Sequence, residues 1–223
     1  WVVQKYLERP MLLWGRKFDL RIWVLVTPND EICVYRQGYL RTSSSPFTTD
    51  TIAGDADGKS SGFIHLTNFC MQKNSPSVGK YEDGNTLSYI QFQEYVNEHY
   101  EEMGMEKAID VSQTIMPKIY TLIVDAVLAG RNACGMKHSS TIKTESVRKS
   151  FELFGYDFMV DEDLRPWLIE VNTNPYLGTQ NKWHGELVEV MVEDLITKCV
   201  DPLFPKPTGE GNHVFQWEEE KRD

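Results

Sequence analysis

The stretch from residue 151 to residue 176, FELFGYDFMVDEDLRPWLIEVNTNPY, constrains the fold of this chain most strongly. Its pattern predicts two short strands, residues 155–161 and 166–173, joined by a tight acidic turn at residues 161–163. Three polar side chains interrupt these otherwise apolar strands: Asp157, Glu170 and Asn172. A hairpin with a four-residue loop places Asp157 opposite Glu170 or Asn172, and either register puts all three on one face. A register shifted by one residue would separate Asp157 from the other two.

Two carboxylates and one amide oxygen are hard ligands that suit Mg²⁺, which takes few protein oxygens and fills its shell with phosphates and water. The same three side chains also fit the solvent-facing side of an amphipathic hairpin. The spacing alone does not separate a metal site from a solvated face.

The run GYDFMVD, followed by WLIEVNTNP, is similar to the magnesium-binding signature of the tubulin tyrosine ligase and tubulin tyrosine ligase-like family, a branch of the ATP-grasp ligases. The resemblance implies that Asp157, Glu170 and Asn172 hold the magnesium ion of bound ATP. It also implies an α+β, ATP-grasp-like fold, in which helices flank a mainly antiparallel sheet.

Near the start of the chain, the segments QKYL and GRKFDLR resemble the nucleotide-binding motifs of the family. Charged and apolar residues alternate in GRKFDLR, so Lys17, Asp19 and Arg21 share one face of a strand. This ladder fits either a phosphate-facing site, with Asp19 fixing the two cations or meeting the ribose, or a cross-linked surface. The resemblance implies that Lys17 and Asp19 contact ATP and that Lys17 and Arg21 are catalytic, with Arg21 near the γ-phosphate or acyl-phosphate. It assigns four further residues to the nucleotide: Gln4, Lys5, Tyr6 and Leu7.

The segment HLTNFCMQK, residues 65–73, gains its meaning from the resemblance. Thr67 and Asn68 match family positions near the nucleotide phosphates. A second group of positions is implied to bind the amino-acid substrate, with a guanidinium that forks its carboxylate: Arg41, Phe69, Lys73 and Thr173. Glutamate-ligating members often carry tyrosine at the position of Phe69, and EVNTNPYL departs from both the N-G-A-P and N-A-S-P forms. The amino acid therefore stays open between tyrosine and glutamate, with glycine less favoured.

Composition narrows the class of partner. The net charge of −10 argues against a general binder of nucleic acid or acidic membranes. No apolar run reaches the length of a membrane span, and the first residues do not resemble a signal peptide. The four cysteines are scattered, so neither a zinc site nor a disulfide framework is predicted. We expect a reducing, cytoplasmic setting. Residues 131–149, with five basic residues against one glutamate, fit either a docking surface for an acidic partner or a solvated loop.

Along the chain, residues 1–3 are predicted to form a buried strand, and residues 43–62 a surface loop. Helices are expected at residues 87–102, 111–131 and 185–199, with Pro117 marking a start or a kink, and a short one at 145–151. Residues 1–205 would be the C-terminal portion of one ATP-grasp ligase domain whose upstream part is missing, and residues 206–223 a partly ordered tail.

The resemblance implies an ATP- and Mg²⁺-dependent ligase that joins a free amino acid to the acidic tail of tubulin through an acyl-phosphate. It implies action in the cytoplasm at microtubules, including those of cilia. Because the family's upstream ATP-grasp segment has no counterpart here, this fragment alone is open to being inactive. Two different functions also fit the motifs: a catalytically inactive microtubule-binding module, and an ATP-grasp ligase of small molecules.

Overall fold

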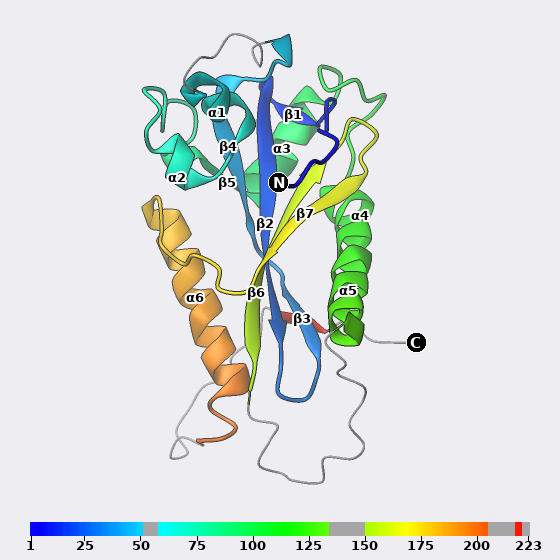
Figure 1. The fold of residues 1–223 in the computed structure, drawn as a ribbon, viewed down its shortest axis with the longest axis vertical. Helices are drawn as coiled ribbons and strands as arrows, with labels where there is room; N and C mark the ends of the chain where they lie inside the picture. The colour runs from blue at the N-terminus through cyan, green and yellow to red at the C-terminus, as the bar shows by residue number, and fades with distance from the viewer. Residues whose placement is uncertain (51–57, 134–149, 205–216, 220–223) are drawn as a thin grey trace. The chain divides into compact units, whose positions relative to one another are not determined.

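The computed structural model describes residues 1–50, 58–133, 150–204 and 217–219 (Figure 1). The chain forms two compact units. Unit 1 comprises Trp1–Arg21, Gly38–Lys118 and Asp157–Ile169, and unit 2 comprises Ile22–Gln37, Ile119–Tyr156 and Glu170–Asp223. Strands β2 (Arg16–Val26), β6 (Glu152–Val160) and β7 (Pro166–Asn172) contribute residues to both.

Unit 1 is built on antiparallel strands. The first half of β2, the long blue strand of Figure 1, pairs with β1 (Leu12–Leu13) and β4 (Tyr39–Pro46), and β4 pairs with β5 (Thr86–Ser88). Asp19 and Arg41 lie directly opposite each other in the β2–β4 register. Directly opposed residues point to the same face, so this register brings an aspartate and an arginine of different motifs into contact.

The longest helix of unit 1 is α3 (Tyr89–His99). Unit 1 also contains the first three residues of α5 (Met116–Ala133), and the rest of α5 belongs to unit 2. The others are α1 (Lys59–His65), α2 (Phe69–Gln72), the 3₁₀ turn η2 (Asp83–Asn85) and α4 (Val111–Thr114). Ser88 caps α3 through a capping box with Gln91, so the helix begins two residues after the predicted start. Pro117 is the second residue of α5, where its missing N–H costs nothing; the predicted start near it is confirmed.

In unit 2 the second half of β2 pairs with β3 (Ile32–Tyr35), and β3 pairs with β8 (Trp217–Glu219). The predicted helix at 185–199 is present as α6 (Lys182–Cys199), capped by Asn181. The buried Trp23 ring lies 6.1 Å from Tyr35 and 6.5 Å from His184, measured between ring centroids. Strand β8 lies within residues 206–223, which were expected to form a partly ordered tail; its three residues form a strand. Together the two units confirm an α+β fold with helices flanking a mainly antiparallel sheet.

Three expectations fail. The predicted surface loop at residues 43–62 is shorter, because residues 43–46 belong to β4, where Ser43 and Ser44 are buried, and residues 59–62 belong to α1. Residues 1–3 form no strand, and the side chains of Trp1, Val2 and Val3 are exposed, because no described strand pairs with them. Residues 150 and 151 are not helical, and the rest of the predicted helix at 145–151 lies outside the described residues. The same is true of most of the basic segment 131–149 and of residues 51–57 of the predicted loop. Within the described ranges, no helix is both long and apolar enough to cross a membrane.

The turn between β6 and β7 is one residue shorter than the expected four-residue loop. The N–H of Asp161 donates to the carbonyl of Arg165 at 3.0 Å, which encloses three residues, and the last of these, Leu164, has a φ of +59°. The Asp161 carboxylate accepts from the N–H of Asp163 at 3.0 Å, of Arg165 at 2.9 Å and from Trp167 Nε1 at 2.8 Å. A side chain that satisfies three donors fixes this turn without glycine.

Candidate functional site

A buried cluster of charges in unit 1 forms around Asp157, which is 2% exposed. Arg21 donates two hydrogen bonds to its carboxylate, from Nε to Oδ1 at 2.5 Å and from Nη2 to Oδ2 at 3.0 Å. Arg41 adds a third from Nη2 to Oδ2 at 2.7 Å. The predicted metal ligand, the predicted catalytic arginine and the predicted amino-acid-binding arginine therefore meet at one carboxylate.

The cluster continues through Asp19. Arg41 Nε donates to Asp19 Oδ1 at 2.7 Å, and the Thr67 hydroxyl donates to Asp19 Oδ2. All five side chains are less than a tenth exposed. The cluster thus joins β2, β4, β6 and the connection between α1 and α2, and its two arginines balance its two aspartates.

This electrostatic balance keeps the charges in place. Burial alone would raise the pKa of Asp157, but hydrogen bonds and charge from Arg21 and Arg41 hold it below its usual range. Burial would also lower the pKa of Arg41, yet Asp19 and Asp157 raise it above the usual value. Each charge is therefore buried with opposite partners and satisfied hydrogen bonds, the condition under which buried ions are tolerated.

Lys17 stands apart because its partners are neutral. Its Nζ donates to the carbonyl of His65 at 2.8 Å and to the Tyr6 hydroxyl at 3.4 Å, and it lies 5.1 Å from the centre of the Tyr6 ring. Lys17 is 7% exposed, and no carboxylate forms a salt bridge with it among the described residues. Burial lowers its pKa. A nearly buried ammonium without a paired carboxylate suits an incoming anion such as a phosphate.

Tyr6 and His65 build the surroundings of Lys17. The Tyr6 hydroxyl and His65 Nδ1 are 2.7 Å apart, and both rings contact Phe47. The buried Nε2 of His65 has no hydrogen-bond partner in the described part of the chain. Polar groups left open beside an unpaired ammonium are compatible with a bound nucleotide.

The other predicted nucleotide and amino-acid positions make fewer contacts. Gln4 and Lys5 are exposed and Leu7 is half-buried. Asn68 and Phe69 are half-buried at the start of α2, and Lys73 is exposed at its end. The roles assigned to these six residues remain predictions.

The other predicted metal ligands, Glu170 and Asn172, lie in unit 2. The Asn172 amide donates to Glu170 Oε1 at 3.2 Å, which keeps the two oxygen-bearing side chains together. Their donor chemistry fits Mg²⁺. Thr173 is exposed. The metal assignment remains a prediction. Among the described residues no three His, Cys, Asp or Glu side chains cluster for a metal, but this set has only two carboxylates.

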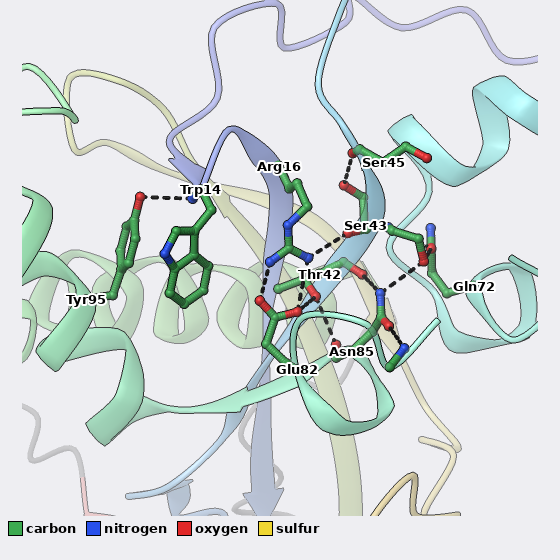
Figure 2. A network of polar contacts seen from close by, with 11 residues as sticks. Trp14, Arg16, Thr42, Ser43, Ser45, Gln72, Glu82, Asn85 and Tyr95 are labelled. Atoms are coloured by element: carbon green, nitrogen blue, oxygen red, sulfur yellow. Dashed lines mark hydrogen bonds and ion pairs between the residues drawn. The ribbon is translucent and has the colours of Figure 1, made fainter. Parts of the chain in front are cut away.

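A second buried ion pair, between Arg16 and Glu82, was not predicted from the sequence. The guanidinium of Arg16 contacts both carboxylate oxygens of Glu82, and Nη1 also donates to the carbonyl of Ser43 at 2.9 Å. The Thr42 hydroxyl donates to Glu82 at 2.9 Å. Figure 2 shows the guanidinium directed at Glu82 and Ser43, with the Trp14 ring between Arg16 and Tyr95.

This ion pair stabilises β2, the strand that carries Lys17, Asp19 and Arg21. Arg16 directly precedes Lys17 on β2, and Glu82 directly precedes η2, so the pair ties the two segments together. Its only signal in the sequence is an arginine in a conspicuous motif, and the charge of Glu82 within YEDGN gives no sign of burial. His65 and Asp161 were missed for the same reason, since their roles come from contacts that the sequence pattern does not reveal.

Comparisons with known proteins show what this chain is similar to. A family model described as the tubulin-tyrosine ligase family matches residues 1–208. The chain is similar to Tubulin glycylase 3D of Tetrahymena thermophila, with 36% identity over 212 residues, which cover 93% of this chain and 18% of that protein. It is similar to Probable tubulin polyglutamylase TTLL9 of Rattus norvegicus, with 30% identity over 88% of this chain and 38% of that protein. It is also similar to Tubulin monoglycylase TTLL3 of Homo sapiens, with 32% identity over 92% of this chain and 24% of that protein. The chain spans 18% to 38% of the length of these three relatives.

Proposed function

The chain belongs to the tubulin-tyrosine ligase family, and from this premise we propose that it is part of an ATP- and Mg²⁺-dependent ligase that joins an amino acid to tubulin. The observation that carries the proposal is the buried cluster, which gathers Asp19, Arg21, Arg41, Thr67 and Asp157 from four separate segments. The motifs relate each of these positions to ATP, to magnesium or to the amino acid, and their contacts within one cluster support that relation.

The reaction would proceed in two steps. A carboxylate of the protein substrate attacks the γ-phosphorus of ATP, the bond to the β-phosphate breaks, and an acyl-phosphate and ADP form. The amine of the amino acid then attacks the acyl carbon, phosphate leaves, and an amide results. Bound Mg²⁺ would neutralise phosphate charge, held by Asp157, Glu170 and Asn172.

The side chains of this chain would supply position and charge. Lys17, without a carboxylate partner, would bind a phosphate oxygen. Arg21 would neutralise charge on the transferred phosphoryl group, and Arg41 would bind the carboxylate of the amino acid with its guanidinium fork. No covalent enzyme intermediate is needed, because phosphoryl transfer depends mainly on positioning and electrostatics.

The amino acid is the open part of the proposal. The motifs favour tyrosine or glutamate, whereas the relatives named above are glycylases and a polyglutamylase. Glycine therefore joins the first two as a substrate to be tested. We place the reaction in the cytoplasm at microtubules, including those of cilia.

The test uses the full-length protein with tubulin, ATP and Mg²⁺, and separately labelled tyrosine, glutamate and glycine. Incorporation of one label into tubulin, dependent on ATP, would establish the ligase and identify its amino acid. A matched reaction with free glutamate as acceptor and no tubulin distinguishes a small-molecule ligase from a tubulin ligase, because only the former would form product there. If a folded full-length protein binds microtubules but incorporates no label, the inactive microtubule-binding module replaces the ligase.

A further inference from the structure

A cavity of about 340 Å³ lies in unit 1, apart from the candidate site. Three segments line it: the β1–β2 turn with the residues before it, the end of α3 with the chain that follows, and the β6–β7 turn. Neither Lys17 nor any residue of the buried charged cluster is part of the lining. The volume is at the lower end of the roughly 300–1,000 Å³ of ligand sites, so one long side chain suits it better than a larger molecule.

Backbone strain is concentrated at this cavity. Among the described residues, four that are not glycine have a positive φ: Trp14, Asp30, Asn85 and Leu164. Aspartate and asparagine adopt this left-handed region comparatively easily, whereas tryptophan and leucine are strained there. The two strained residues, Trp14 with a φ of +46° and Leu164 with a φ of +59°, both line the cavity. Such strain persists only where the surrounding structure imposes it, and it gathers at ligand-binding sites.

The turn that carries Trp14 shows what the strain achieves. Leu13 pairs with Arg16, so Trp14 and Gly15 form a two-residue hairpin turn with both residues left-handed, for which asparagine followed by glycine is preferred. The backbone N–H of Trp14 donates to the Tyr95 hydroxyl at 2.9 Å, and the two ring centroids lie 4.4 Å apart (Figure 2). Trp14 is nevertheless 47% exposed. The ring is therefore already held in place, and a ligand would contact it without first having to order it.

The charged residues of the cavity are acidic. Glu102 and Glu162 line it with side chains that are 73% and 45% exposed, and its described lining includes no lysine or arginine. Glu162 forms an ion pair with Arg9 at 2.6 Å, but the side chain of Arg9 is 75% exposed, and a surface pair of this kind contributes little. Glu102 lies 3.3 Å from Nδ1 of His99, which balances its charge only when protonated. Apolar walls with two accessible carboxylates fit a side chain that has an apolar stem and a cationic head.

We propose that this cavity binds an arginine side chain presented by a basic segment of a partner protein. The methylene groups of the arginine pack against the apolar lining, which includes Leu12, Trp14 and Met105. Its guanidinium donates to Glu102 and Glu162, because a planar guanidinium forks carboxylates in a way that the ammonium of lysine does not. An acidic segment, such as the tubulin tail of the proposed function, would be repelled here. The inference therefore concerns a second interaction and does not depend on the ligase activity.

Methionine-methyl NMR of the full-length protein tests this directly, because Met103 and Met105 line the cavity. The probe is a short glycine–serine peptide with one central arginine, added without ATP or tubulin. We expect the methyl signals of Met103 and Met105 to shift with a Kd of about 1 mM. The signal of Met191, which is buried in α6, should stay unchanged.

Matched peptides test the chemistry of the ligand. Citrulline or glutamate in place of the arginine removes the charge-assisted hydrogen bonds, and we expect binding at least about tenfold weaker. Equal affinity for the citrulline peptide would overturn the inference. The absence of any shift at Met103 and Met105 would also overturn it, and that is the result expected if another segment of the full-length protein fills the cavity.

Two glutamate variants make the same change of charge on either side of His99. Glu102→Gln removes a carboxylate of the cavity, and the Kd for the arginine peptide should rise about fivefold. Glu98→Gln is the matched control, because Glu98 lies 4.0 Å from His99, is 75% exposed and does not line the cavity. It should leave the Kd unchanged. Equal losses in the two variants would show that the peptide responds only to the net charge of the surface, which would overturn the inference.

Trp14→Asn separates the ligand from the fold. Asparagine suits the left-handed position, so relief of strain offsets the lost ring contact with Tyr95. Hydrogen exchange in β1 and β2 should therefore stay within about threefold of wild type, while the Kd for the arginine peptide rises at least about fivefold. Undiminished binding would contradict the inference. If the hairpin opens instead, Glu102→Gln decides the question, because its exposed side chain lies outside the turn.

Discussion

Replacing Glu82 by alanine tests the buried ion pair most directly. The substitution removes both contacts with the guanidinium of Arg16 and the acceptor of the Thr42 hydroxyl. Arg16 is 1% exposed and, among the described residues, would keep the Ser43 carbonyl and the rings of Tyr81 and Trp14, whose centroids lie 4.2 Å and 5.8 Å away. An uncompensated buried charge of this kind costs about 3–5 kcal/mol. That is a large part of the roughly 5–15 kcal/mol that stabilise a folded domain.

The measurement is hydrogen–deuterium exchange of the full-length protein, followed in peptides from β4 and η2. A loss of about 3 kcal/mol corresponds to exchange more than roughly 100-fold faster in these peptides. The paired variant Arg16→Met with Glu82→Leu removes both charges, and it should exchange more slowly than Glu82→Ala, since no charge is left unpaired. The reasoning is refuted if Glu82→Ala changes exchange less than about fivefold, or if the paired variant is the less stable of the two.

Three further predictions concern single residues. Asp161→Ala removes an acceptor of three N–H groups and should destabilise the β6–β7 turn by about 3 kcal/mol, measured by the same exchange method. Burial would raise the pKa of Asp161, but the hydrogen bonds outweigh burial and hold the pKa below its usual value. The contribution of Asp161 to stability should therefore be complete above about pH 4 and decline as the pH falls through the lowered pKa. Glu170→Gln should abolish ligation and weaken Mg²⁺-dependent binding of a fluorescent ATP analogue; because Glu170 is exposed, the thermal midpoint should stay near wild type, and normal ligation would contradict the metal assignment. Lys17→Met should weaken ATP binding at least about tenfold without loss of stability, since burial already disfavours the ammonium; unchanged affinity in an equilibrium titration would remove Lys17 from the phosphate site.

The sequence predicted the fold class and most element positions, because these depend on local patterns. The alternation in GRKFDLR indicated the face shared by Asp19 and Arg21, and the helical period indicated α6. The prediction of a buried strand at residues 1–3 was wrong, because an apolar run is buried only where a neighbouring strand covers it. The pattern of three residues carries no information about such a neighbour.

The site was predictable as a set of residues but not as a set of contacts. The motifs named Arg21, Arg41 and Asp157, yet nothing in the spacing indicates that both arginines bind the same carboxylate. The length of the β6–β7 turn depended on Leu164 adopting a positive φ, a conformation that side chains such as leucine seldom take. Turn chemistry based on glycine and asparagine could not reveal it.

The balance of two arginines and two aspartates in the buried cluster has a consequence for how this protein can change over generations. A single substitution that removes the charge of Asp19, Arg21, Arg41 or Asp157 leaves the cluster with an unpaired charge, and an unpaired buried charge is strongly destabilising. Loss of a charge at one of these positions is therefore tolerated only together with a compensating substitution at a second position. Divergence among descendants of this gene should therefore accumulate outside these four charged positions.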